Sequence, residues 1–219
     1  MTLKLILFDV DGTLVDSQAA IVGAMGEAFA GVGLVAPDRA TVLSIVGLSL
    51  DHAIRRLAPQ QDEATQDALV EGYKQAYHAA RLQHGAGHSP LYPGAAELLQ
   101  KLHAVPEYLL GVATGKSQRG MDALIEVHGL SCFVTRQVAD HHPSKPHPSM
   151  IRTAMAETGV EPEDTVMIGD TSFDIEMAQA AGVRSIAVSW GYHDPARLGA
   201  DHRIDSFEEL QPLLTRLWS

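Results

Sequence analysis

Two aspartates, two positions apart, follow a short apolar run near the start of the chain. Asp9 and Asp11 lie in the segment FDVDGT. Side chains two apart on a strand point the same way, and Gly12 lets the chain turn so that the second carboxylate can lie beside the first. Parallel α/β sheets bind ligands at the carboxyl ends of their strands, which favours a functional pair. Taken alone, the pattern fits two solvated turn aspartates equally well.

A second acidic pair follows a later apolar run. Asp170 and Asp174 lie in the segment GDTSFD, four positions apart. At the start of a helix this spacing places both carboxylates on one side. Carboxylate oxygens suit a hard cation such as Mg²⁺. The alternative is that the two acids cap a helix and complement its dipole.

Two further motifs could bind an anion. Thr114 and Gly115 close an apolar run and open a helical pattern. A hydroxyl and free N–H groups at a helix start can hold a phosphate-sized anion, although Thr114 alone fits a plain N-cap. Lys145, between Ser144 and Pro146, could neutralise a phosphoryl group and a carboxylate, although alone it fits a surface lysine.

An alternation of strand and helix patterns must position these motifs. Glycines at 129, 159 and 182 are suited to end three of the helices. Strands alternating with helices predict an α/β domain with a parallel sheet, whose carboxyl edge would gather all four motifs. Strand patterns lie at 3–10, 108–113, 165–168 and 185–189, with weaker ones at 132–134 and 202–204, and helical patterns at 95–103, 117–128, 148–157 and 172–181.

The region between the first and second strands interrupts the alternation. It contains successive helical patterns and no strand pattern. Turn-forming residues follow at 85–90 and 92–94. We therefore expect residues 1–16 and 84–219 to form the α/β core and residues 17–83 to form an inserted helical domain. The four helices are expected at 17–30, 38–46, 50–57 and 62–83.

In chain order, the motifs are Asp-x-Asp, Thr, Lys and the acid pair. In this order the chain resembles the haloacid dehalogenase-like hydrolase superfamily, over almost its whole length. The resemblance implies a Rossmann-like parallel sheet core with an inserted α-helical cap. It also implies that Asp9 is a covalent nucleophile, Asp11 a general acid and base, and Lys145 a catalytic cation. Mg²⁺ would be bound by Asp9, Asp170 and the backbone carbonyl of Asp11, with Asp174 acting through water or orienting the ligands.

The resemblance extends to substrate binding. Thr114 and Gly115 would hold the phosphoryl oxygens. The loop 46–49 resembles the family's specificity loop. Arg55 or Arg56 could reach a substrate anion, although a solvated helix face explains at least one of them.

Charge and composition limit the partners. The net charge of -11 argues against nucleic acids and anionic membranes. The single cysteine, Cys132, excludes an intramolecular disulfide and suits a reducing cytosol. No signal-peptide pattern and no apolar stretch of ~20 residues is found. We expect a cytoplasmic monomer or homodimer that acts on a small phosphorylated metabolite.

The subfamilies of the superfamily differ at a few positions. Asp11 favours phosphate chemistry, because the dehalogenases lack this second acid and need no metal. Mutases of the beta-phosphoglucomutase type carry a histidine near Ile21, where this chain has none, and phosphonate-cleaving relatives use a cap lysine that Lys74 matches poorly. The segments 188–193 and 200–204 are similar to the phosphoglycolate phosphatase group.

We predict a Mg²⁺-dependent phosphatase that hydrolyses a small phosphate monoester through an aspartyl-phosphate, with 2-phosphoglycolate as a candidate substrate. A phosphomutase and a pyrophosphatase are the alternatives. One departure from the family pattern is Ser144, which stands where a glycine is usual before the lysine. Three histidines flank this loop and raise the alternative of a transition-metal site, although a polar surface loop explains them better: His141, His142 and His147.

Overall fold

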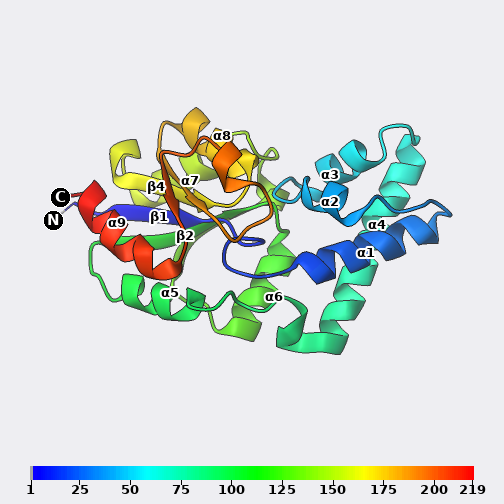
Figure 1. Cartoon of the computed structure of the whole chain (residues 1–219), viewed down its shortest axis with the longest axis horizontal. Helices are drawn as coiled ribbons and strands as arrows, with labels where there is room; N and C mark the ends of the chain where they lie inside the picture. Colours follow the sequence, from blue (N-terminus) through cyan, green and yellow to red (C-terminus); the bar gives the residue numbers. More distant parts are fainter. Residues whose placement is uncertain (1) are drawn as a thin grey trace.

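The core of the molecule is a six-stranded parallel sheet (Figure 1). The computed structural model describes residues 2–219. The strand order is β3-β2-β1-β4-β5-β6, which places β1 between β2 and β4. The strands are β1 (Lys4–Phe8), β2 (Tyr108–Thr114), β3 (Phe133–Val138), β4 (Thr165–Gly169), β5 (Arg184–Val188) and β6 (His202–Ile204).

Helices cover both faces of this sheet. Leu5 and Leu7 of β1 pack against α7 and α8 on one face, and Ile6 and Phe8 pack with α5, α6 and α9 on the other. All four side chains are fully buried, which explains the uninterrupted apolar run and confirms the expected α/β fold. The helices are α5 (Ala95–His103), α6 (Gln118–His128), α7 (Ser149–Thr158), α8 (Ser172–Ala181) and α9 (Leu210–Leu217), with short 3₁₀ turns η2 (Ala139–His141), η3 (Pro162–Asp164), η4 (Pro195–Arg197) and η5 (Phe207–Glu209).

The sequence predicted the helix ends better than the edge strand. Gly129, Gly159 and Gly182 follow α6, α7 and α8 with φ of 66°, 67° and 75°, as expected for left-handed C-terminal caps. β3 continues to Val138, beyond the predicted 134. It lies at the sheet edge and alternates buried with exposed residues, so its apolar run is broken.

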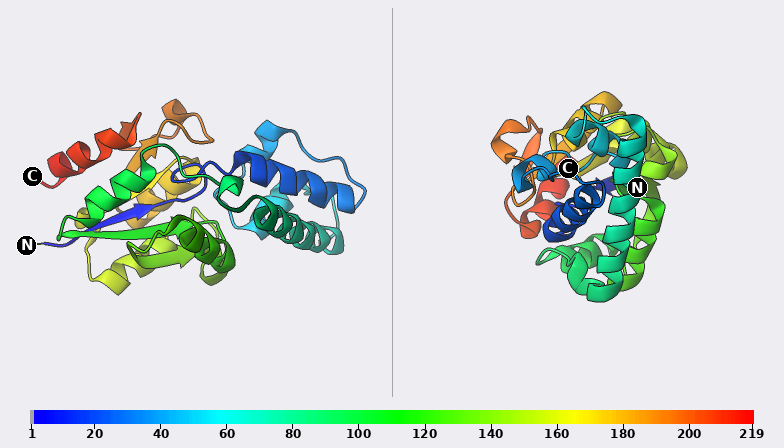
Figure 2. Two further views of the ribbon diagram at one scale, coloured as in Figure 1. Left: turned by 90° about the horizontal axis from the view of Figure 1, so that it is seen from below. Right: turned by 90° about the vertical axis from the view of Figure 1, so that its right-hand side faces the viewer.

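Four helices form a separate unit beyond the end of β1 (Figures 1 and 2). They share an apolar cluster that includes Met25, Phe29, Ile54 and Leu69. α2 ends at Leu43, before the predicted 46, and the chain then turns at Gly47 with φ of 103°. The elements are α1 (Gln18–Gly31), α2 (Arg39–Leu43), α3 (Leu50–Leu57) and α4 (Glu63–His84), followed by the 3₁₀ turn η1 (Gly85–His88).

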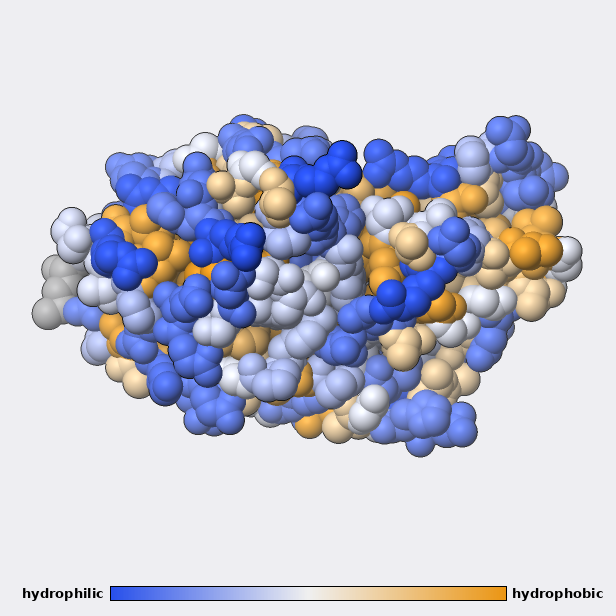
Figure 3. Space-filling view, in the orientation of Figure 1, coloured by the Kyte–Doolittle hydropathy of each residue, from blue (hydrophilic) through white to orange (hydrophobic). Residues whose placement is uncertain are grey.

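Two neighbouring segments connect the helical unit to the sheet. The Asp16 N–H donates to the Pro90 carbonyl at 2.8 Å, and Val15 forms an antiparallel bridge with Leu91. The chain therefore leaves and re-enters the core at one place. On the face in Figure 3, polar residues cover most of the surface and separate apolar areas lie on both parts. Among residues 2–219, no helix has the length and apolarity needed to cross a membrane.

Candidate active site

Asp9 directly follows β1 at the carboxyl edge of the sheet. Its backbone N–H donates to the Ile168 carbonyl at 2.8 Å, and its side chain is buried. Oδ1 accepts a hydrogen bond from Lys145 Nζ at 2.8 Å. Oδ2 is buried without a hydrogen-bond partner, although Asp9 lines a cavity. The Asp9 carboxylate is therefore held in place through Oδ1, while Oδ2 accepts no hydrogen bond.

Lys145 is a buried cation rather than a surface lysine. Its side chain has no exposed area, and Nζ lies 2.6 Å from Asp174 Oδ1 as well as 2.8 Å from Asp9 Oδ1. Burial by itself lowers the pKa of Lys145, but Asp174 and then Asp9 outweigh it and raise the pKa above its usual range. The ammonium group therefore stays charged between the two carboxylates.

The second acidic pair lies beside Asp9. Asp170 accepts hydrogen bonds from Thr13 Oγ1 at 3.0 Å and from the Tyr192 N–H at 2.8 Å. Asp174 Oδ2 accepts from the Thr171 N–H at 3.0 Å and from its hydroxyl at 2.7 Å. Asp174 thus caps α8 and also faces the site. One carboxylate oxygen from each of Asp9, Asp170 and Asp174 lies within 4.8 Å of the others.

This cluster fits a hard divalent cation. Of the three buried carboxylates, Lys145 pairs with those of Asp9 and Asp174, so ionisation of all three leaves excess negative charge in the site. Burial, together with the charge of Asp174, raises the pKa of Asp9 to about 7 in spite of Lys145. Burial and then Asp174 and Asp9 raise the pKa of Asp170. A cation would stabilise the charged carboxylates, and all-oxygen donors match Mg²⁺.

The histidine-rich loop does not form a competing metal site in the described residues. The one qualifying group of metal-ligating side chains among residues 2–219 is the aspartate cluster. His142 is instead hydrogen-bonded to Gln137 and Ser149, each at 2.8 Å. The transition-metal alternative therefore receives no support.

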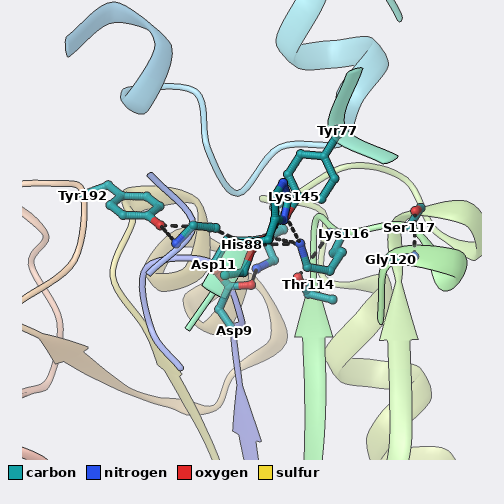
Figure 4. A network of polar contacts seen from close by, with 12 residues as sticks. Asp9, Asp11, Tyr77, His88, Thr114, Lys116, Ser117, Gly120, Lys145 and Tyr192 are labelled. Atoms are coloured by element: carbon teal, nitrogen blue, oxygen red, sulfur yellow. Dashed lines mark hydrogen bonds and ion pairs between the residues drawn. The ribbon is translucent and has the colours of Figure 1, made fainter. Parts of the chain in front are cut away.

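Asp11 belongs to a different polar network (Figure 4). Its Oδ1 accepts from Ser17 Oγ at 2.6 Å, and Lys116 Nζ lies 2.9 Å from Oδ2. Gly12 makes this turn possible, with φ of 88°, and a Cβ there would lie 2.2 Å from Asp170 Oδ2. Only glycine fits both the backbone conformation and this close approach.

Lys116 is the main site residue that sequence reasoning missed. It follows Thr114 and Gly115 directly, but nothing in the local pattern identifies its partners. Nζ also lies 3.3 Å from the hydroxyl of Tyr77, on α4. Burial lowers the pKa of Lys116, but Asp11 and then Tyr77 outweigh burial and raise it. Asp11 is thus connected through Lys116 to the helical unit.

Thr114 and Gly115 line the cavity at the end of β2. The Thr114 hydroxyl accepts the Lys116 N–H at 3.2 Å. A Cβ on Gly115 would lie 2.6 Å from the carbonyl oxygens of Gly47 and Leu48, so the loop 46–49 passes directly over this glycine. The family's expected specificity loop therefore does border the site.

Ser144 also contacts this loop. It is buried, and its hydroxyl accepts the Ser49 N–H at 2.9 Å. The departure from glycine before the lysine therefore does not displace Lys145, which remains paired with Asp9. Instead, Ser144 joins the core to the helical unit.

Arg55 is not brought to the cavity in this structure. Its side chain is 57% exposed and its nearest carboxylate is Glu63, at 3.9 Å. Arg56 lies over the Phe173 ring, 5.4 Å from its centroid. Ala53 and Ile54 face the interior, which turns the arginine face of α3 outward. Other basic residues line the cavity instead: Lys74, His78, Arg81, Lys116 and Arg119.

The cavity lies between the sheet edge and the helical unit. It has a volume of about 570 Å³. Asp9, Asp11 and Thr114 line it from the core, and Ile21 and Tyr77 line it from the helices. The site can therefore accept a small molecule between a buried carboxylate cluster and a surface supplied by α1 and α4.

A family model described as "Haloacid dehalogenase-like hydrolase" matches residues 6–188. The chain belongs to this hydrolase family. It is 36% identical over 214 residues to a "Probable phosphatase IndB" of Dickeya dadantii, covering 94% of this chain and 91% of that protein. It is 32% identical over 216 residues to a "Phosphoglycolate phosphatase" of Chromobacterium violaceum, covering 97% and 96%.

A solved structure shows the same fold. The crystal structure of a "predicted phosphoglycolate phosphatase" from Haemophilus somnus superposes with a TM-score of 0.85 at 25% identity, covering 97% of this chain and 98% of that one. The sequence resemblance to this superfamily and to its phosphoglycolate phosphatase-like group is thus confirmed.

Proposed function

We propose that this protein is a Mg²⁺-dependent phosphatase that hydrolyses small phosphate monoesters through an aspartyl-phosphate on Asp9. The observation that carries the proposal is Asp9 itself. It is a buried carboxylate with one oxygen fixed by Lys145 and the other unpartnered at a cavity. Phosphatase relatives make phosphate monoesters the substrate class to test, with 2-phosphoglycolate first.

In this mechanism Asp9 Oδ2 attacks phosphorus as the bond to the ester oxygen breaks. Asp11 donates a proton to the departing alkoxide and later takes a proton from the water that attacks the phosphoenzyme. The second step releases phosphate and restores Asp9. Lys145 keeps Asp9 oriented and offsets its charge, while Thr114 and the Gly115 N–H would hold the phosphoryl oxygens.

Asp9, Asp170 and the backbone carbonyl of Asp11 would bind Mg²⁺, with Asp174 supporting them. When bound, the cation would supply charge neutralisation for the phosphoryl oxygens. Asp174 already has both oxygens engaged, one by Lys145 and one by Thr171, which suits a supporting role.

We further propose that residues 17–83 act as a cap over the core formed by residues 1–16 and 84–219. The helices have their own apolar cluster and line the side of the cavity facing the sheet edge. A cap that closes over bound substrate would exclude bulk water from the phosphoenzyme. Ile21, buried at this cavity, supplies no imidazole for the mutase cycle, which favours hydrolysis over phosphomutase activity.

The test is phosphate release from a panel of phosphate esters, pyrophosphate and hexose phosphates with Mg²⁺, using wild type and Asp9→Asn. We expect Mg²⁺-dependent release that the variant loses. Acid quenching with a ³²P-labelled ester should trap label on wild type but not on Asp9→Asn. A folded wild-type protein that releases no phosphate, or an unchanged Asp9→Asn variant, would contradict the proposal.

A further inference from the structure

A group of basic side chains lines the cavity outside the catalytic network. Lys74, His78 and Arg81 stand on α4 at helical spacing, so they share one face. Arg119 enters the same cavity from α6. Neither the proposed mechanism nor the sequence motifs use these residues.

The two arginines lack acidic partners in a strongly acidic protein. The chain has 27 acidic residues against 16 lysines and arginines. Within residues 2–219, neither Arg81 nor Arg119 has a carboxylate within the 4.0 Å of an ion pair, although Lys74 pairs with Glu71 at 2.7 Å. The Arg81 guanidinium instead contacts His78 Nδ1 at 3.0 Å.

Several acidic residues lie near this group without forming an ion pair with either arginine. Asp140 lines the cavity but accepts the backbone N–H of Gln118, at the start of α6. Asp51 also lines it and stands in the first turn of α3, where the helix dipole stabilises its charge. Asp122 and Glu126 on α6 also lie near the arginines, and none of these four carboxylates is within 4.0 Å of either guanidinium among residues 2–219.

The local electrostatics of this basic group favour a bound anion. Arg119 is the second residue of α6, where the helix dipole opposes a positive charge. Burial, then the charge of Arg119 and then that of Arg81 lower the pKa of His78. Both arginines therefore act on the same imidazole. An anion bound here would relieve the repulsion between the arginines.

We propose that Arg81 and Arg119, with His78 and Lys74 beside them, form a second anion subsite for the substrate. The subsite would bind a carboxylate or a second phosphoryl group on the molecule whose phosphate is transferred to Asp9. Guanidinium groups match both anions through paired hydrogen bonds. Because Arg81 lies on the helical unit and Arg119 on the core, the anion would contact both parts. This inference rests on the proposed phosphatase function.

The test uses pairs of substrates in which only one member carries the second negative charge. The carboxylate pair is 2-phosphoglycolate with its amide. The phosphate pair is 1,3-propanediol bisphosphate with 3-hydroxypropyl phosphate. Each pair is assayed with wild type, Arg81→Gln, Arg119→Gln and a matched control, Arg216→Gln. Arg216 is exposed on α9, at the other end of the molecule (Figure 1).

We expect wild type to prefer the anionic member of at least one pair by about tenfold or more in kcat/KM. Arg81→Gln and Arg119→Gln should each reduce that preference by most of its size, and Arg216→Gln should retain it. The pair with the larger preference identifies carboxylate or phosphate as the bound group. Equal losses on both members of a pair, or no preference in wild type, would overturn the subsite. Absence of phosphate release from every ester, including p-nitrophenyl phosphate, would instead refute the phosphatase proposal.

Discussion

The two lysine–aspartate pairs of the site are built from different parts of the molecule. Lys145 is fully buried and contacts only core residues, Asp9 and Asp174. Lys116 contacts Asp11 in the core and Tyr77 in the helical unit. The proposed nucleophile, Asp9, is therefore held by the sheet edge, whereas the proposed acid–base residue, Asp11, depends on how the helices sit. Replacing Lys145 should therefore slow the attack on phosphorus, whereas replacing Lys116 should slow proton transfer to the leaving group.

Lys145→Met should have the largest effect. It leaves Asp9 and Asp174 buried without their cation, and breaking a buried pair costs about 3–5 kcal/mol of unfolding free energy. Phosphate release should also fall by about 10²-fold or more, because Asp9 loses its orienting donor. Urea unfolding without Mg²⁺ and steady-state kinetics with Mg²⁺ measure the two effects. The control is Lys101→Met, whose lysine is exposed on α5 and lies outside the cavity lining, and comparable stability losses in both variants would contradict a special role for the buried pair.

Adding Mg²⁺ should stabilise the Asp9 side of the site. At 100 times its dissociation constant, a cation that binds only the folded state adds about 2.7 kcal/mol. Thermal unfolding in EDTA and in Mg²⁺ measures this shift. Asp170→Asn should lose most of it, whereas Asp11→Asn should keep it, because only the backbone carbonyl of Asp11 is an expected ligand. If Mg²⁺ stabilised Asp170→Asn as much as wild type, the metal would have to bind at another site.

Lys116→Met should affect catalysis according to the leaving group. The Asp11 carboxylate loses the side chain that orients it toward the cavity, so transfer of a proton to an alkoxide should slow by about 10–100-fold. Hydrolysis of p-nitrophenyl phosphate should slow much less, because its leaving group departs without a proton. Comparing kcat for an alkyl and an aryl ester in wild type, Lys116→Met and Asp11→Asn tests this. Equal losses on both esters would show that Lys116 does not act through Asp11.

Ser144→Gly should have the smallest effect. It removes the acceptor of the Ser49 N–H and restores the residue usual in the family. We expect a loss of about 1 kcal/mol or less and a change mainly in KM, since the loop 46–49 borders the cavity. Ser144→Ala serves as the matched control for backbone freedom. A large fall in kcat would instead show that Ser144 helps to place Lys145.

Local patterns were sufficient for the core and for the order of its motifs. Continuous apolar runs predict strands that are buried on both faces, and β1, β4 and β5 are such strands. In a parallel sheet their carboxyl ends meet at one edge, so the distant residues Asp9, Thr114 and Asp170 could be expected together. The edge strand β3 was predicted too short because only one of its faces is well buried.

The contacts between the helical unit and the core could not be predicted in the same way. Arg55 was a reasonable choice from its position, but the apolar residues of α3 turn it toward solvent. Tyr77 and Arg81 carry no local signal of function, because on an isolated helix they fit a solvated face. Their importance depends on the packing of α4 beside the end of β2 and the start of α6.

Residue types and spacing therefore determined the class of fold and which side chains meet at the sheet edge. The alternation of side chains along a strand is regular, so a short stretch of sequence is enough to predict it. Only the tertiary structure decided which lysine faces Asp11, what Ser144 contacts and which arginines reach the cavity. Those contacts join elements far apart in the sequence, and their geometry follows from how whole helices pack rather than from any short motif.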